Sequence, residues 1–197
     1  MNIKRIFDIL VSLFLIIFFL PVCFIIALLI ILFDDFPILF IQNRIGYKGK
    51  SFSLIKFRTM KSSQSLQKKH FNIGDTSRIT LIGSYLRKTK LDELPQLVNV
   101  LFGSMSLVGP RPELIEWVNI YPQRWVKIHS IKPGITDPAS IVYRNEEKIL
   151  SGSINPEATY RDKILPHKLS IYENYIDNWS FSGDITILVK TIISLFR

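Results

Sequence analysis

The longest apolar run in the chain covers residues 9–33, close to its first residue. Ser12 is its one hydroxyl residue, and none of its side chains is charged. About 20 apolar residues are enough for a helix to cross the hydrocarbon core of a bilayer, so the run predicts a membrane helix. A secretory signal peptide is disfavoured, because the run is too long for one and no small-residue cleavage site follows it.

Pro21 lies at the centre of this run and leaves two topologies open. A proline inside a helix removes a backbone hydrogen bond and clashes with the preceding turn, so the segment is either a kinked but complete span or a re-entrant hairpin. Each arm of a hairpin broken at Pro21 has about 12 residues and rises about 18 Å, less than a hydrocarbon core of about 30 Å. A complete span would separate Lys4 and Arg5 from the other basic residues, against the positive-inside tendency.

The pattern after this run predicts a hairpin and two helices. Residues 38–41 and 52–57 read as short strands, and the two glycines within 46–49 favour a turn between them. Helices are expected over 77–88 and 93–102.

Two further segments are expected to form loops, and a last one a helix. Residues 61–74 are rich in Ser, Gln and Lys, and prolines punctuate residues 110–138. From residue 182 onward, apolar residues recur at helical spacing on one face (Ile185, Leu188, Val189, Ile192, Ile193 and Phe196). Such a face packs on a core or lies in the membrane interface, and the pattern leaves both open.

Composition narrows the class of protein. The chain has 197 residues, 48% of them hydrophobic, with 25 Lys and Arg against 16 Asp and Glu and a net charge of +9. Disordered chains combine high charge with low hydrophobicity, so disorder is excluded. One cysteine, Cys23, excludes an internal disulfide framework and a cysteine-based zinc site. The three histidines are far apart and have no metal-ligand spacing.

The positive charge is concentrated in residues 36–91, which hold twelve basic residues and a single acid, Asp75. Nucleic acid is disfavoured as a ligand, because the chain has no DNA- or RNA-binding motif. Anionic lipid headgroups, a phosphorylated substrate at the membrane, and a solvated face with no ligand remain. A phosphate site would have to be built from side chains and turns, because no glycine-rich phosphate loop is present.

Two adjacent carboxylates, Asp92 and Glu93, follow the basic stretch and precede Pro95. Proline suits the first turn of a helix, so one interpretation is a helix cap favoured by the helix dipole. The other is catalytic: cations and the dipole keep Asp92 ionised, and an ionised aspartate beside a clamped phosphate attacks phosphorus. Such an attack needs a divalent cation and Arg or Lys to screen the charges.

Six short motifs follow one another along the chain: Gln42-Asn43-Arg44-Ile45-Gly46, Lys56-Phe57-Arg58-Thr59-Met60, Leu91-Asp92-Glu93-Leu94-Pro95-Gln96-Leu97, Gly103-Ser104-Met105-Ser106-Leu107-Val108-Gly109-Pro110-Arg111-Pro112, Lys132-Pro133-Gly134-Ile135-Thr136 and Asn178-Trp179-Ser180. In this order and spacing they resemble the bacterial sugar transferase family of monotopic polyprenyl-phosphate phosphoglycosyl transferases. The similarity extends from Lys4-Arg5-Ile6-Phe7-Asp8 to the final helix, over nearly the whole chain.

The resemblance implies a specific reaction. Such an enzyme transfers a phospho-sugar from a UDP-sugar to a polyprenyl phosphate, usually undecaprenyl phosphate, and releases UMP. This is the first membrane step of surface polysaccharide or glycoconjugate synthesis. The implied cofactor is Mg²⁺, and the implied partners are the two substrates and membrane lipids, with no nucleic acid; a homo-oligomer is left open. A non-catalytic membrane adaptor that binds anionic lipid is the alternative.

The resemblance also implies an architecture. The fold class is α+β and predominantly helical, with a re-entrant membrane helix broken at Pro21 in residues 1–35. Residues 36–197 form a small catalytic domain with interfacial amphipathic helices, on the cytoplasmic face of the bacterial inner (plasma) membrane.

Roles for individual residues follow from the matching motifs. Asp92 is implied to be the nucleophile, forming a covalent phospho-sugar intermediate, and a ligand of Mg²⁺. Glu93 is implied to assist, and a role as the base for the lipid phosphate is left open. Arg87 and Arg111 are implied to hold phosphate or nucleotide, a task that suits the rigid donor fork of arginine. Lys56 and Arg58 are further candidates for phosphate binding, with a structural or lipid-facing role as the alternative.

Two departures from the family pattern stand out. The break in related proteins is often Ser-Pro, but here it is Leu20-Pro21, and a leucine has no hydroxyl to satisfy a carbonyl freed by the bend. Asp137-Pro138-Ala139-Ser140 stands where many relatives have Gly-Trp-Ala-Gln or Gly-Leu-Ala-Gln. The motifs name no particular sugar.

Overall fold

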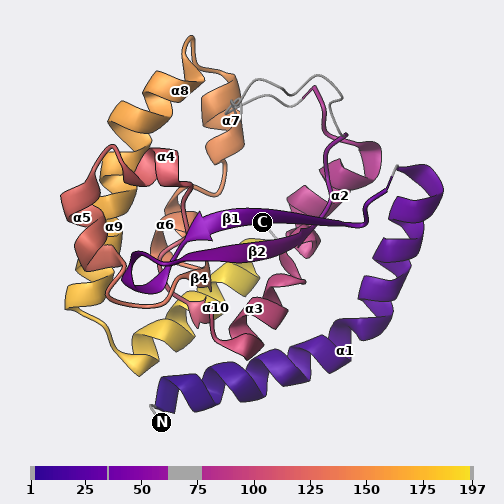
Figure 1. Cartoon of the computed structure of the whole chain (residues 1–197), viewed down its shortest axis with the longest axis horizontal. Coiled ribbons are helices and arrows are strands. Elements are labelled where there is room, and N and C mark those ends of the chain that lie inside the picture. Colours follow the sequence, from indigo (N-terminus) through magenta and orange to yellow (C-terminus); the bar gives the residue numbers. More distant parts are fainter. Residues whose placement is uncertain (1–2, 35, 62–76, 196–197) are drawn as a thin grey trace.

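The computed structural model describes residues 3–34, 36–61 and 77–195, and within them the chain is mostly helical. Its strands form two small two-stranded sheets, and Figure 1 shows how the helices are arranged around the longer of them. The predicted α+β, predominantly helical class is confirmed in this general form. Most of the loop expected at 61–74 lies outside the described residues.

The N-terminal apolar segment forms α1 (Ile3–Phe33), a single helix that continues through Pro21. Figure 1 shows α1 bending part-way along its length, so that it runs along two sides of the rest of the molecule. A proline inside a helix is a common cause of such a bend. The predicted break into two separate arms is not confirmed. By length and composition α1 could cross a membrane, and only 11% of its most apolar stretch is buried.

Both halves of α1 pack on the globular part of the chain. In the first half, Phe7 and Val11 contact a core cluster that includes Val100 and Met105. In the second half, Ile26 and Ile30 are buried against Phe57 and Leu86, together with α2 (Leu81–Thr89). The remaining apolar side chains of the helix are largely exposed.

Polar contacts attach the start of α1 to the segment around α3 (Gln96–Phe102). Arg5 donates hydrogen bonds to the carbonyl oxygens of Val100 and Leu101 at 2.6 and 2.8 Å. These carbonyls lie in the last turn of α3, where the Val100 oxygen also accepts from the N–H of the C-cap residue Gly103 at 3.0 Å. Asp8 is buried and accepts hydrogen bonds from the Ser106 hydroxyl at 2.8 Å and the Leu107 N–H at 3.1 Å.

A buried carboxylate joins α1 to the last two helices, α9 (Leu165–Asp177) and α10 (Phe181–Leu195). Asp184 pairs with Lys4 and accepts hydrogen bonds from the Tyr175 hydroxyl at 2.6 Å and the Trp179 indole N–H at 3.1 Å. The basic pair before the apolar run is therefore fastened to the globular part of the protein.

The predicted hairpin is confirmed. Strands β1 (Leu39–Ile45) and β2 (Ser51–Phe57) pair antiparallel around the turn η1 (Tyr47–Gly49). The side chain of Asn99 in α3 forms hydrogen bonds with the backbone of β2. Its amide nitrogen donates to the Ser53 carbonyl at 2.8 Å, and its oxygen accepts from the Ile55 N–H at 3.2 Å.

A second sheet replaces part of the loop expected over 110–138. Strands β3 (Ser106–Val108) and β4 (Gly134–Thr136) are parallel, and Gly109 lies against Gly134. A Cβ atom built on Gly134 would lie 2.1 Å from the backbone nitrogen of Gly109, so the two backbones meet where no side chain fits. This contact fixes the start of residues 110–112.

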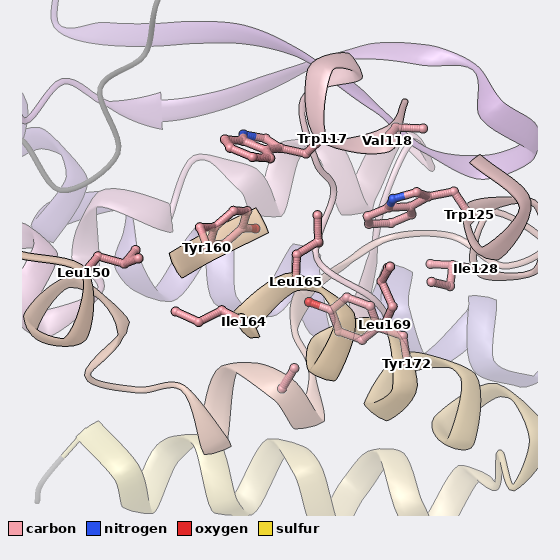
Figure 2. Close-up of a cluster of buried hydrophobic side chains, with 11 residues drawn as sticks. Trp117, Val118, Trp125, Ile128, Leu150, Tyr160, Ile164, Leu165, Leu169 and Tyr172 are labelled. Carbon is pink, nitrogen blue, oxygen red and sulfur yellow. The ribbon is translucent and has the colours of Figure 1, made fainter. Parts of the chain in front are cut away.

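Short helices surround the largest core. They are α4 (Ile115–Val118), α5 (Pro122–Ile128), α6 (Pro138–Val142), α7 (Glu146–Ser151), α8 (Pro156–Thr159) and the π-helix η3 (Tyr160–Ile164). Figure 2 shows Trp117, Trp125, Tyr160 and Tyr172 gathered in this core, with Leu150 of α7 at one end.

The final helix forms as predicted, and part of its apolar face packs on the core. Leu188 packs on the core beside α3, whereas Val189, Ile192 and Ile193 are exposed. Phe196 lies outside the described residues.

The role of Asp184 in holding α1 can be measured. Asp184→Ala removes the acceptor shared by Lys4, Tyr175 and Trp179, and we expect it to lower the free energy of unfolding by about 3 kcal/mol. The control is Glu116→Ala, an exposed position in α4. Thermal unfolding of the full chain in detergent compares the two variants, and equal melting temperatures would show that the cluster does not hold the helix.

Candidate active site

The two carboxylates predicted from the sequence lie in a tight turn between α2 and α3. Lys90 ends α2 in the left-handed region, with φ 60°, and the turn η2 (Leu91–Glu93) follows at once. Pro95 then precedes the first residue of α3. Neither η2 nor α3 receives a side-chain cap, so the interpretation of Asp92 and Glu93 as capping residues is not supported.

Glu93 is the centre of an ion-pair cluster. Its Oε1 atom accepts from Lys56 Nζ at 2.9 Å and from Arg111 Nη2 at 2.6 Å. Burial alone would raise the pKa of Glu93, but Arg111 and Lys56 outweigh it and hold the pKa well below the usual range. Glu93 in turn raises the pKa of Arg111. The carboxylate is therefore ionised, and both of its neighbours are cations.

Asp92 lies beside this cluster, but its environment differs from that of Glu93. Its side chain is buried, and among the described residues its Oδ1 atom has no hydrogen-bond partner. Burial, followed by the charge of Glu93, raises its pKa, and the opposing effects of Lys56 and Lys90 are smaller. Nearby cations favour the ionised form of Asp92, as expected, but desolvation and the adjacent carboxylate oppose it and have the larger effect on its pKa.

Arg111 reaches Glu93 from a rigid loop. Pro110 and Pro112 flank it. Glu113, which follows Pro112, is held by both its side chain and its backbone. Its carboxylate accepts from the Tyr160 hydroxyl at 2.5 Å and from Arg44 at 3.4 Å. Its backbone oxygen accepts from the Ile45 N–H at 3.0 Å. These contacts fix the guanidinium of Arg111 beside the two carboxylates.

Arg87 faces the same site from α2. Asp92, Arg111 and Glu93 all act on it electrostatically, although burial has the largest effect and lowers its pKa. Its guanidinium forms an ion pair with Glu147 of α7. The structure therefore places Asp92, Glu93, Lys56, Arg111 and Arg87 in one charged region, built from four separate parts of the chain.

Arg58 is placed differently from the other candidates. Its buried guanidinium donates to the Phe36 carbonyl and lines a hollow of about 180 Å³ with Asp34, Lys61 and Thr80, at the end of α1. No described contact joins it to Asp92 or Glu93. Of the two alternatives for this residue, a structural role is the one that its contacts support.

The donor set suits a cation held jointly with substrate. Among the described residues, no group of three or more His, Cys, Asp or Glu side chains could hold a metal ion. Asp92 nevertheless has a buried carboxylate oxygen without a partner, and Mg²⁺ in enzymes is commonly bound by one or two carboxylates plus substrate phosphates. The residues present fit Mg²⁺ in that form, and Asp92 is the side chain that would bind it.

The sequence reasoning missed two residues of the site. Glu113 follows Pro110-Arg111-Pro112 directly, and this adjacency was the available signal. Glu147 meets Arg87 although 60 positions separate them, and no local pattern indicates such a pairing.

The fold and site define a class of protein: an enzyme with one exposed apolar helix and a buried carboxylate pair surrounded by cations. The chain belongs to the bacterial sugar transferase family, whose pattern it matches over residues 1–197. It is 37% identical over 192 residues to the sugar transferase EpsL of Bacillus subtilis (strain 168), covering 98% of this chain and 86% of that protein. The predicted class, a phosphoglycosyl transferase, is confirmed.

Two further relatives have names that state a reaction. The UDP-glucose:undecaprenyl-phosphate glucose-1-phosphate transferase of Klebsiella pneumoniae is 35% identical over 197 residues, 98% of this chain and 40% of that protein. The UDP-N-acetylgalactosamine-undecaprenyl-phosphate N-acetylgalactosaminephosphotransferase of Aeromonas hydrophila is 34% identical over 193 residues, 96% of this chain and 43% of that protein. The chain spans less than half the length of either. Family membership and the one apolar helix fit membrane association.

The raised pKa of Asp92 predicts an effect on stability. Asp92→Asn removes a buried charge that Glu93 repels, and we expect a gain of about 1 kcal/mol in the free energy of unfolding. In a chain of this size, that gain raises the melting temperature at pH 7 by about 2–4 °C. Because the folded-state pKa is raised, the gain is full above that pKa and disappears as the pH falls towards the ordinary aspartate range.

Thermal unfolding in detergent at several pH values measures this effect. Asp177→Asn, an exposed position on α9, is the matched control and should show no such gain. A lower melting temperature for Asp92→Asn at pH 7 would contradict the assignment of a raised pKa.

Proposed function

We propose that the protein transfers a phospho-sugar from a UDP-sugar to undecaprenyl phosphate by double displacement, with Asp92 as the nucleophile. The observation that carries this proposal is the buried, unpartnered Oδ1 atom of Asp92 beside a cluster of fixed cations. The relatives whose names state a reaction also support it, because both are undecaprenyl-phosphate sugar-phosphate transferases.

The two half-reactions balance as follows. A carboxylate oxygen of Asp92 attacks the β-phosphorus of the UDP-sugar, and the bond from that phosphorus to the bridging oxygen breaks, so that UMP departs with the oxygen. An oxygen of the polyprenyl phosphate then attacks the same phosphorus. The bond to Asp92 breaks, the carboxylate is restored, and a polyprenyl-diphosphate sugar leaves.

Each neighbouring side chain has a role in this scheme. Arg111 and Arg87 bind the diphosphate, since a guanidinium can donate two parallel hydrogen bonds to phosphate oxygens. Glu93, paired with Lys56 and Arg111, keeps both cations next to Asp92. Its lowered pKa makes it a weak base, so positioning of the cations is the role we assign to it rather than proton abstraction.

Mg²⁺ bound by Asp92 and the substrate phosphates would supply the positive charge that screens an anionic nucleophile from an anionic substrate. Lys56 and Lys90 act in the same direction, because both favour the ionised form of Asp92. The ionised form is the one that can attack phosphorus.

We further propose that α1 enters and leaves the membrane by the same face, with the catalytic part on the cytoplasmic side. A straight helix of 31 residues would be about 46 Å long, and a complete crossing would separate its ends by the thickness of the bilayer. Instead, Arg5 and Asp8 near one end and Ile30 near the other all contact the same globular part. The bend in α1 supports this placement.

The reaction is tested by UMP release. Detergent-solubilised protein is incubated with Mg²⁺, undecaprenyl phosphate and a panel of UDP-sugars, beside Asp92→Asn and the surface control Asp177→Asn. We expect release from at least one sugar, at least a thousandfold slower in Asp92→Asn, unchanged in the control, and abolished by a chelator. Release that survives in Asp92→Asn would remove the nucleophile assignment. No release from any sugar, together with anionic-vesicle binding that is unaltered in Asp92→Asn, would favour a lipid-binding adaptor.

Topology is tested separately by cysteine labelling. Ile154 is fully exposed on the catalytic part, so Ile154→Cys in a Cys23→Ala background reports which side of the membrane this part occupies. We expect a membrane-impermeant maleimide to label it only after spheroplasts are opened. Labelling of intact spheroplasts would place the catalytic part outside and overturn the proposed topology.

A further inference from the structure

Arg87 is the one arginine in the charged region that forms an ion pair with a residue from outside it. Its partner is Glu147 of α7, a helix that packs on the large core through Leu150. The side chain of Glu147 is 54% exposed and that of Arg87 is 28% exposed. The pair therefore lies at the edge of the charged region, where solvent reaches it.

The helix that carries Glu147 is firmly attached through its other side chains. Leu150 is buried in the large core, at the end nearest Tyr160 in Figure 2. Glu146 forms an ion pair with Lys168, whose side chain is only 5% exposed. Displacement of Glu147 from Arg87 therefore requires rotation of one side chain into water, and α7 itself can stay in place.

We propose that Glu147 is an internal competitor for the phosphate-binding guanidinium of Arg87, displaced when a nucleoside diphosphate binds. A half-exposed ion pair is weak, whereas a diphosphate oxygen pair offers charge-assisted, bidentate hydrogen bonds to the same group. Glu147 thus keeps Arg87 in place without substrate and raises the concentration of substrate needed to occupy the site. The inference rests on the proposed function for the identity of the ligand.

Binding of UDP, and of inorganic pyrophosphate as a second probe, to the full-length protein in detergent tests this competition by calorimetry. Glu147→Gln keeps the shape of the side chain but removes its charge, and we expect it to lower the Kd for UDP about two- to fivefold. The KM for the UDP-sugar should fall by a similar factor, with kcat unchanged. Glu157→Gln, an exposed acid on the neighbouring α8, is the control for loss of general negative charge and should change neither constant.

A double-mutant cycle with Arg87→Gln separates competition from long-range electrostatics. The gain from Glu147→Gln should vanish once Arg87 is absent. An equal gain in the Arg87→Gln background, or no gain in the wild-type background, overturns the inference while leaving the proposed reaction intact.

The two probes separate failure of the inference from failure of the proposed function. If the wild type binds pyrophosphate but not UDP, the nucleotide assignment fails, and the effect of Glu147→Gln on pyrophosphate still decides the inference. If it binds neither probe, Arg87 has no ligand for which Glu147 could compete, and both are overturned.

Discussion

The charge of Glu93, buried between Lys56 and Arg111, is the constraint on which the catalytic region depends. Burial of a carboxylate costs free energy unless the group is paired. Three separate parts of the chain must therefore bring their charged side chains together. Strand β2 supplies one cation, the loop before Glu113 supplies the other, and the turn after α2 supplies the acid. Once Glu93 is paired, Asp92 is left beside it with a buried carboxylate oxygen that has no hydrogen-bond partner among the described residues. The environment of Asp92 thus follows from the pairing of its neighbour.

The same principle explains how the apolar helix is attached. Hydrophobic contacts alone would not distinguish packing on the protein from packing in lipid, because both environments are apolar. The buried polar contacts of Arg5 and Asp8, and the ion pair of Lys4 with Asp184, have no equivalent in a lipid tail region. They fix the first turns of α1 against the globular part, whereas the second half of the helix is held by the apolar contacts of Ile26 and Ile30.

The parts of the fold that could be predicted from sequence are those with a local signal: the apolar run of α1, the hairpin, and the periodic final helix. The helices between 115 and 164 have only four to seven residues each, too few to show a helical period. In the site, family motifs indicated Asp92, Glu93 and Arg111. The sequence shows the cations near Asp92 but not its burial, and burial is the largest effect on its pKa.

Lys90 shows what this arrangement costs. A lysine in the left-handed region is strained relative to glycine by about 1 kcal/mol or more, and the structure places it there directly before Asp92 and Glu93. A glycine would relieve the backbone but would remove one of the charges that favour an ionised Asp92. At this residue, an unstrained backbone and a positive charge beside Asp92 are opposing demands. A search for thermostable variants that screens folding alone would therefore select against a charge that favours the ionised form of that carboxylate.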